Sequence, residues 1–379
     1  MTKIKLLLSV AAASVLLLNG CVDVNRNDTL NVNYDGTDDG SDSGATGFCT
    51  DENTISGFID TDLELTQDTC LDGKVQVTQT GSITANNITI AGKADTKAWL
   101  EVVPGGQLFS KNVLFTSEEE ASGGTGKAGD WGGVTLIGND NTDEEGTAIN
   151  SQLEGYEVDD IYPGIVGELG DMNDNSGSII DCTFNNTGIA VQDEKEINGL
   201  SFVGVGSGTT ISGITVNRAG DDAVEIWGGH VVLTDVTIVG AGDDGFDNDD
   251  GWAGSVTGLS VSGAANSGLE LSGNTHATYT DVSIDTSGTL AADDVGGAIY
   301  LKKTAIGGYF YNVNIIDNQT NIDSQDVYGT IVTDAADLDH LEGDNIVISG
   351  SNTAGSVTEG PNYDANVSTT TEVATALGL

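Results

Sequence analysis

Acidic residues recur at fixed spacing in the middle of the chain. When the segments that begin at Ala219, Ala241 and Ala264 are aligned, three polar columns appear. The columns consist of Asp221, Asp243 and Asn266; of Asp222, Asp244 and Ser267; and of Glu225, Asp247 and Glu270. If the segments stack as successive turns of a solenoid, carboxylates in one column lie about 4.8 Å apart. At that distance they repel one another unless they point into solvent or share a cation.

The segment 243–251 (DDGFDNDDG) concentrates carboxylates most strongly. Hard oxygen ligands in glycine-containing turns suit Ca²⁺, although the segment lacks the distal bidentate glutamate of an EF-hand. We therefore expect a Ca²⁺ site whose ligands come from Asp221, Asp222, Asp243, Asp244, Asp247, Asp249 and Asp250. The alternative is a solvated acidic turn in a chain with 59 acidic residues. A second oxygen-rich segment, 171–176 (DMNDNS), is either a metal loop or an ordinary Asx-turn loop.

The same region offers residue types that occur in polysaccharide-cleaving enzymes. The candidate catalytic set is Arg218, Asp221, Asp222, His230, Asp243 and Asp244. A lyase needs Ca²⁺ and a basic residue, and Arg218 is one of only two arginines in the chain. The alternative for Arg218 is a salt bridge to a carboxylate on a neighbouring coil. A hydrolase needs carboxylates on both sides of the sugar. His230 follows Asp222 by only eight residues, which does not match the polygalacturonase spacing.

Short alternating apolar segments would position these side chains. Val216 and Ile238 are 22 residues apart, and Val261 and Ile284 each follow after another 23. A constant period in the low twenties, with short strands and Gly or Asn turns, indicates a parallel β-helix. The composition agrees, because 53 glycines and only 3 prolines are typical of an all-β, turn-rich chain.

The net charge of −47 excludes nucleic acid as a partner, because such a surface repels phosphates. It also repels a polyanionic polysaccharide unless a cation lies between the two.

The N-terminal segment is an export signal. Lys3 and Lys5 precede an apolar run at residues 6–18, which is followed by Asn19, Gly20 and Cys21. A run of this length is too short to span a membrane and matches a secretory signal peptide at residues 1–20. The junction resembles a bacterial lipobox, which predicts a lipid on Cys21 and anchoring in the outer membrane. The alternative is an ordinary signal peptide with a chance cysteine.

The rest of the chain divides by composition. Residues 21–48 are acidic and poor in apolar side chains, as in a disordered tether. Residues 49–128 are expected to form a cap and the first coils, residues 129–350 the β-helix core, and residues 351–379 a cap or tail. In an oxidising compartment Cys49 and Cys70 are expected to form a disulfide, whereas Cys182 lies in an alternating run and should be a buried thiol.

Several motifs between residues 129 and 262 occur together in one known family. They are GDWGGVTLIGN, DNSG, NGLSFVGVGSGTTISGITV, AGDDAVEIWGGHV and GAGDDGFDNDDGWAG. The combination resembles a family of bacterial secreted and lipoprotein β-helix proteins. The resemblance implies a right-handed parallel β-helix at the cell surface and no particular reaction. His230 stands where the family usually has Thr, which favours a test for enzymatic activity.

Taken together, the sequence predicts a calcium-binding surface β-helix lipoprotein with an adhesive, structural or glycan-binding role and a polysaccharide as partner. The alternative is a Ca²⁺-dependent polysaccharide lyase or glycoside hydrolase. Trp131, Trp227, Trp252 and Tyr300 are candidates for stacking on sugar rings or for packing inside the turns.

Overall fold

The fold is taken from a computed structural model, which describes residues 47–140, 170–192, 195–249, 251–286, 297–303, 306–318, 330–350, 357–360 and 369–379. The expected signal peptide at residues 1–20, the lipidation site Cys21, nearly all of the tether at residues 21–48 and the expected ligand Asp250 lie outside these ranges.

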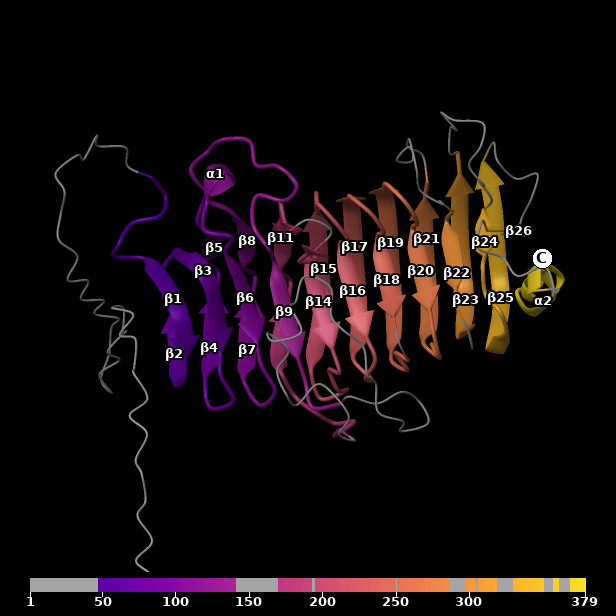
Figure 1. The fold of residues 1–379 in the computed structure, drawn as a ribbon, viewed down its shortest axis with the longest axis horizontal. Coiled ribbons are helices and arrows are strands. Elements are labelled where there is room, and N and C mark those ends of the chain that lie inside the picture. The colour runs from indigo at the N-terminus through magenta and orange to yellow at the C-terminus, as the bar shows by residue number, and fades with distance from the viewer. Residues whose placement is uncertain are drawn as a thin grey trace, which may run out of the picture. The chain divides into compact units, whose positions relative to one another are not determined.

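Parallel strands stacked in successive coils make up most of the described chain (Figure 1). The predicted repeat is confirmed, because Val216 pairs with Ile238, Ile238 with Val261, and Val261 with Ile284. The molecule is an all-β, right-handed parallel β-helix, as the sequence predicted.

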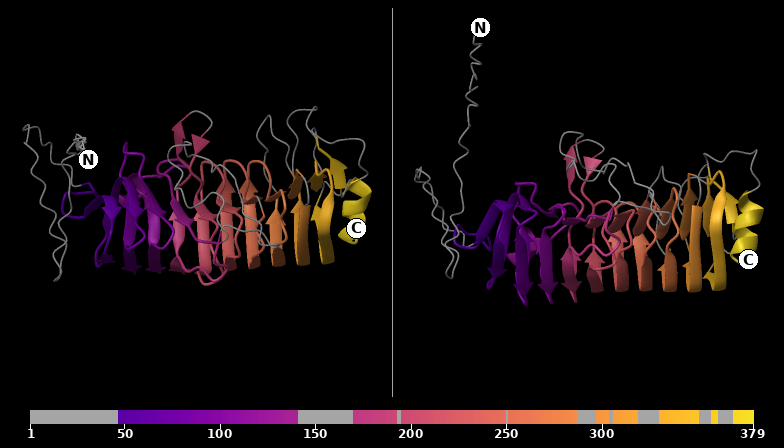
Figure 2. Two further views of the ribbon diagram at one scale, coloured as in Figure 1. Left: turned by 60° about the horizontal axis from the view of Figure 1, so that its bottom comes forward. Right: turned by 90° about the horizontal axis from the view of Figure 1, so that it is seen from below.

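The coils form three sheets that run along the stack (Figures 1 and 2). Sheet A comprises the last parts of β1 (Thr54–Ile59) and β3 (Thr69–Val77) and then β6 (Trp99–Val102), β9 (Val134–Ile137), β14 (Leu200–Val203), β16 (Val224–Trp227), β18 (Phe246–Asp249), β20 (Leu269–Ser272), β22 (Ile299–Lys302), β24 (Ile331–Thr333) and β26 (Val357–Glu359). Sheet B comprises β2 (Asp62–Leu65), β4 (Ser82–Asn86), β7 (Gln107–Lys111), β10 (Gly177–Ile180) and the first parts of the long strands β15 (Thr210–Asn217), β17 (Val232–Ala241), β19 (Ser255–Ala264), β21 (Thr278–Asp285), β23 (Ile306–Asp317) and β25 (Leu338–Gly350). Sheet C comprises the first parts of β1 and β3, then β5 (Thr89–Gly92), β8 (Leu114–Ser117), β11 (Thr183–Asn185) and the last parts of the long strands.

Each long strand bends where it passes from sheet B to sheet C. Asp235, Gly258 and Asp281 occupy equivalent bend positions on three coils and have φ angles of 54°, 77° and 56°. Only Gly, and with less ease Asn or Asp, adopts this left-handed conformation without strain. Further along, the amide of Asn345 donates a hydrogen bond to Oδ1 of Asn312, 2.8 Å away on the preceding coil. A column of Gly, Asn and Asp therefore defines this corner.

Side chains that repeat from coil to coil fill the interior. The rings of Phe115 and Phe184 stack with centroids 4.7 Å apart, and those of Tyr279 and Phe310 stack at 4.8 Å. Cys182 is a buried free thiol, as predicted. The stacking follows from the fold, because equal positions on adjacent coils lie one strand spacing apart.

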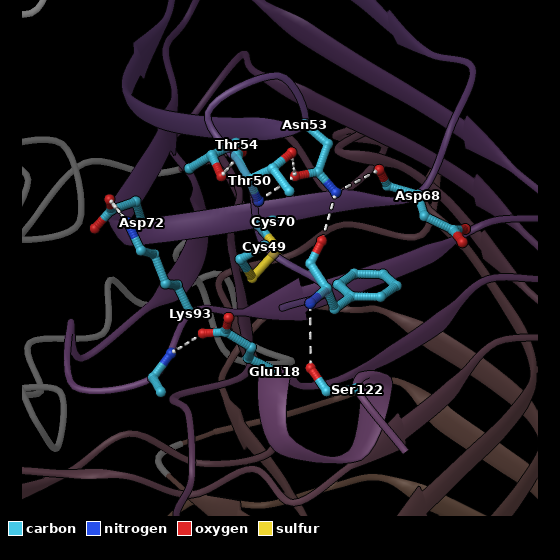
Figure 3. Close-up of a disulfide and its surroundings, with 12 residues drawn as sticks. Cys49, Thr50, Asn53, Thr54, Asp68, Cys70, Asp72, Lys93, Glu118 and Ser122 are labelled. Carbon is cyan, nitrogen blue, oxygen red and sulfur yellow. Dashed lines mark hydrogen bonds and ion pairs between the residues drawn. A yellow bond between two sulfur atoms is a disulfide. The ribbon is translucent and has the colours of Figure 1, made fainter. Parts of the chain in front are cut away.

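Both ends of the stack are closed by local structure. The predicted disulfide between Cys49 and Cys70 is present and ties the segment before β1 to β3 (Figure 3). Beside it, the amide of Asn53 donates to the backbone oxygen of Phe48 at 3.0 Å. At the other end, α2 (Thr369–Ala376) contacts β25 and β26. Val373 of this helix and Leu377, which follows it, are both buried. Residues 369–379 therefore cap the last coil.

An insertion covers part of the outer face of sheet A. It contains the antiparallel hairpin of β12 (Ala190–Gln192) and β13 (Lys195–Glu196). Val191 of the hairpin and the flanking residues Ile189 and Ile197 pack with three outward-facing residues of sheet A, namely Ile137, Val203 and Trp227.

The described ranges contain two helices, α1 (Glu118–Ala121) and α2, and neither is long and apolar enough to cross a membrane.

Candidate cation-binding site

The turns that lead into sheet A carry a ladder of polar side chains. Oδ1 of Asn198 accepts a hydrogen bond from the backbone N–H of Asp222 at 3.1 Å, and Oδ1 of Asp222 accepts one from the N–H of Asp244 at 2.8 Å. Oδ1 of Asp244 in turn accepts one from the N–H of Ser267 at 2.6 Å. Each side chain thereby satisfies a buried backbone group on the next coil, which accounts for short polar residues at this position.

A second set of carboxylates lies on the outer face of sheet A. Glu225 on β16 pairs in register with Asp247 on β18, which pairs with Glu270 on β20. Their exposed fractions are only 2%, 7% and 2%. Part of the cover comes from the insertion, because the amide of Asn198 donates to Glu225 beside the packed side chain of Trp227. Of these three residues only Asp247 lies in the segment 243–251, and for Asp247 the alternative of a solvated acidic turn is wrong.

The ladder and the sheet carboxylates meet in three overlapping groups, within each of which one oxygen per residue lies within 4.8 Å of the others. The outer group is Asp221, Asp222 and Asp243; the middle group is Asp222, Glu225 and Asp247; the inner group is Asp244, Asp247 and Glu270. Because the groups share Asp222 and Asp247, they form one continuous carboxylate array. Asp221 and Asp243 are half-buried, so the outer group lies at the surface end of the array.

Burial and mutual repulsion oppose ionisation of the array. Burial, followed by the charges of Asp247 and Glu225, raises the pKa of Asp222 well above its ordinary value. Burial and the charge of Glu270 likewise raise the pKa values of Asp244 and Asp247. The array must therefore take up either protons or cations at neutral pH.

A lysine contacts the inner group. Nζ of Lys302, on β22, lies 2.5 Å from Oε1 of Glu270. Burial alone would lower the pKa of Lys302, but the charge of Glu270 and their hydrogen bond outweigh it and raise the pKa. Lys302 is therefore an ammonium ion at neutral pH and cannot act as a base there. The adjacent Lys303 pairs instead with Asp249 at 3.2 Å.

The array has the chemistry of a calcium site. Oδ1 of Asp247 and Oε2 of Glu270 are buried and have no hydrogen-bond partner within the described part of the chain. Ca²⁺ binds oxygen ligands at about 2.3–2.6 Å, so ligands on opposite sides of one ion stand up to about 5 Å apart. The spacing within each group is compatible with that limit. An all-carboxylate ligand set favours Ca²⁺ or Mg²⁺ over metals that prefer nitrogen or sulfur.

The structure brings together most of the metal ligands expected from sequence. Asp221, Asp222, Asp243, Asp244 and Asp247 all belong to the array. Asp249 lies beside it and is bound by Lys303.

Two carboxylates of the array were missing from the expected ligand set, and the lysine that contacts the array was not expected there. Glu225 and Glu270 stood in the third polar column, and the repeat alignment is the signal that finds them. Lys302 has no sequence signal that links it to the acidic turns.

Of the candidate catalytic residues, the four aspartates belong to the array, whereas the two basic residues lie elsewhere. Arg218 donates hydrogen bonds to Oε1 of Glu120 at 3.2 Å and to Oδ1 of Asn186 at 2.9 Å. It therefore forms a salt bridge, as its alternative predicted, but with a carboxylate two coils away and not on the neighbouring coil. His230 follows β16, whereas Asp222 precedes it, and Nδ1 of His230 lies 2.8 Å from Oδ2 of the buried Asp140. Among the described residues, therefore, neither Arg218 nor His230 belongs to the array.

Two further expectations concern residues outside the array. In the segment 171–176, Asp171 accepts a hydrogen bond from the backbone N–H of Asn173 at 2.9 Å, and Asn175 accepts one from that of Gly177 at 2.8 Å. These bonds favour the Asx-turn alternative. All four aromatic candidates for sugar stacking are buried, so they pack inside the protein: Trp131, Trp227, Trp252 and Tyr300.

Comparison with known proteins agrees with the architecture. No curated protein matches the chain. Among solved structures, the periplasmic alginate epimerase AlgG is similar with 9% identity over 78% of each chain and a TM-score of 0.29. A double mutant of AlgG is similar with 10% identity over 80% of this chain and 77% of that one, with a TM-score of 0.20. Scores this low carry no weight for function. The model of the pectate-lyase-like β-helix domain, in contrast, matches residues 56–378, and the chain therefore belongs to that family.

Proposed function

We propose that this protein is a calcium-binding β-helix lipoprotein of the cell surface that adheres to acidic polysaccharide. The carboxylate array carries the proposal. It places buried carboxylates of three consecutive coils within ligand distance of one another. Among the residues that the structure describes, Oδ1 of Asp247 has no hydrogen-bond partner. Folding such a cluster is costly unless protons or cations neutralise it, and a bound cation does so with the carboxylates ionised.

The surface end of the array supports binding of a polyanion. A chain with a net charge of −47 repels an acidic polymer, but a divalent cation held between the two surfaces reverses that effect. The half-buried Asp221 and Asp243 offer oxygen atoms at the edge of the array, where uronate carboxylates can complete a calcium coordination shell of 6–8 oxygen atoms.

The N-terminal sequence supports delivery to the cell surface. The apolar run and Gly20-Cys21 match a lipoprotein signal, and the acidic segment that follows suits a spacer between the outer membrane and the β-helix. Labelling with a radioactive fatty acid tests the anchor: wild type should incorporate the label and a Cys21→Ser variant should not. Label in both proteins would contradict a lipid on this cysteine.

Polysaccharide binding can be tested with immobilised polygalacturonate, alginate and a neutral glucan. We expect retention on the two acidic polymers in Ca²⁺ and release by EDTA. An Asp221→Asn, Asp243→Asn variant should lose retention while keeping its circular dichroism spectrum. Binding that is unaffected by EDTA, or equal binding to the neutral glucan, would contradict the proposal.

The alternative is a Ca²⁺-dependent lyase or glycoside hydrolase. It has less support, because Arg218 and His230 lie outside the array and Lys302 is held as an ammonium ion. Incubation with the same polymers separates the two proposals. Unsaturated uronate or new reducing ends, lost in an Asp222→Asn, Asp244→Asn variant, would establish the enzyme and replace the binding-only function.

A further inference from the structure

We propose that the inner group holds a buried structural cation, separate from the cation through which the outer group binds polysaccharide. The inner group consists of Asp244, Asp247 and Glu270. The inference goes beyond the proposed function, because this ion joins two coils of the β-helix and does not contact the polymer. It predicts two bound divalent cations per chain, each with its own ligands and its own role.

Two oxygen atoms of the inner group support this site. Oδ1 of Asp247 and Oε2 of Glu270 are buried, and neither has a hydrogen-bond partner among the described residues. The two residues are only 7% and 2% exposed, and they pair in register on adjacent strands. A buried oxygen atom that has lost its hydration needs a new partner. A cation bound to both residues satisfies both oxygen atoms.

Neighbouring donors orient two of the three carboxylates. Oδ1 of Asp244 accepts a hydrogen bond from the backbone N–H of Ser267 at 2.6 Å. Oε1 of Glu270 accepts one from Nζ of Lys302 at 2.5 Å. Carboxylates that bind metal ions are typically hydrogen-bonded to a further residue in this way, which fixes their orientation. The inner group is therefore preorganised for an ion that binds the second oxygen of each carboxylate.

Lys302 adjusts the charge of the inner group to that of a divalent cation. Three ionised carboxylates carry three negative charges, and the ammonium group 2.5 Å from Glu270 offsets one of them. A single Ca²⁺ or Mg²⁺ balances the two that remain. A monovalent cation leaves one buried charge uncompensated, which is costly.

Burial separates the inner group from the polymer-binding end of the array. Asp221 and Asp243 in the outer group are half-buried, whereas all members of the inner group are buried, and the two groups have no residue in common. A uronate carboxylate can therefore reach the outer group, whereas the inner ion takes its further ligands from the protein and from water. Ser267 carries a buried hydroxyl that has no hydrogen-bond partner within the described ranges, and it contacts Asp244 through its N–H.

Counting bound calcium tests the inference. Each protein is dialysed against CaCl₂, the bound Ca²⁺ per chain is measured by atomic emission, and retention on immobilised polygalacturonate is measured in parallel. Wild type should bind two ions. Glu270→Gln changes only the inner group and should bind one ion while keeping its retention on the polymer. The Asp221→Asn, Asp243→Asn variant changes only the outer group and should bind one ion while losing retention.

Glu225→Gln is the matched control. Glu225 is a buried glutamate of the same column as Glu270, but it belongs only to the middle group. This variant should bind two ions. Glu270→Gln removes the partner of Lys302, so a Glu270→Gln, Lys302→Met variant, which removes both charges of the pair, replaces it if the single variant does not fold. The double variant should likewise bind one ion.

The outcomes separate this inference from the proposed function. A calcium count that is the same in folded Glu270→Gln as in wild type would overturn the inference alone. Loss of an ion from Glu225→Gln, or loss of polymer retention in Glu270→Gln, would also overturn it. A single ion on wild type that is lost in Glu270→Gln and kept in the Asp221→Asn, Asp243→Asn variant would uphold the buried site and overturn the proposed function. No ion on wild type would overturn both.

Discussion

Oδ1 of Asp222 accepts a hydrogen bond from the backbone N–H of Asp244, 2.8 Å away on the next coil. Asp244 has the same relationship with Ser267 at 2.6 Å. A carboxylate has two oxygen atoms, so a single residue can join two coils and still contribute an oxygen to the array. The acidic repeat thus has a structural role as well as the proposed cation-binding role, and the two can be separated by mutation.

Substitutions at Asp222 should distinguish these roles. Asp222→Asn keeps the oxygen that accepts from Asp244 and removes a buried charge, so the metal-free protein should be at least as stable as wild type. Asp222→Ala leaves that buried N–H without its acceptor, at a cost of about 1–3 kcal/mol. Urea denaturation in EDTA measures both changes in the free energy of unfolding. Equal stability of the two variants would show that the hydrogen bond is not stabilising.

The metal-free protein should lose stability as the pH rises. The pKa values of Asp222, Asp244 and Asp247 are raised in the folded state, mainly by burial, so the folded chain holds more protons than the unfolded chain. The stabilising protonation is complete below about pH 4, the ordinary pKa of aspartate, and is lost as the pH rises through the folded-state values. Each proton retained only by the folded state changes the free energy of unfolding by about 1.4 kcal/mol per pH unit.

Thermal unfolding in EDTA between pH 4.5 and 8 measures this dependence. The control is an Asp222→Asn, Asp244→Asn variant, which has the same general surface charge but lacks two of the buried groups. Its midpoint should fall less steeply with pH than that of wild type. Parallel curves for the two proteins would contradict the assignment of the raised pKa values to the array.

The columns of acidic residues could be predicted from the sequence, because they follow from the repeat. Strand stacking turns a period of 22 or 23 residues into columns, and the pairing of Glu225, Asp247 and Glu270 matches the predicted column. The sequence also contains the cue for the corners, because Gly, Asn and Asp at a fixed offset favour a left-handed bend.

Other features of the site depend on contacts between distant parts of the chain. Lys302 reaches Glu270 from 32 residues away, across a connection with no repeat signal. Arg218 meets Glu120 at a separation of 98 residues. The insertion that packs beside Trp227 also interrupts the period. Neither periodicity nor local motif encodes such contacts, so the burial of the acidic turns was not predictable.

Arg218 should act as a structural residue. Burial alone would raise the pKa of Glu120, but hydrogen bonds from Thr116, Asn186 and Asn185 and the charge of Arg218 lower it. Arg218→Gln should reduce the free energy of unfolding by up to about 1 kcal/mol at pH 7, because the pair is partly exposed.

The difference between wild type and Arg218→Gln should shrink on acidification. The contribution of Glu120 is present above its ordinary pKa and is lost as the pH falls through its lowered folded-state pKa. Urea denaturation at pH 7 and at pH 3.5 tests this difference. The second readout is retention of the protein on immobilised polygalacturonate in the presence of Ca²⁺. A folded variant that no longer binds the polymer would place Arg218 in the binding site.

The bend column should tolerate Asn better than Ala. Gly258 has a φ of 77°, and an added Cβ would lie 2.9 Å from Oδ1 of Asp235. Gly258→Ala should destabilise the protein by about 1–2 kcal/mol, because an L-residue is strained in this conformation. Gly258→Asn should cost less, since Asn312 and Asn345 occupy such bends on later coils. Urea denaturation of wild type and the two variants ranks their free energies of unfolding. Equal stability of Gly258→Ala and wild type would contradict backbone strain at this position.

Thermal unfolding with Ca²⁺ or with EDTA tests the central claim most directly. Binding to the folded state alone at a free Ca²⁺ concentration of 100 Kd adds about 2.7 kcal/mol, a rise of several degrees in Tm for a domain of this size. We predict this rise for wild type at pH 7.5 and its absence in an Asp222→Asn, Asp247→Asn variant. An identical Tm for wild type in Ca²⁺ and in EDTA would contradict a cation site in the carboxylate array.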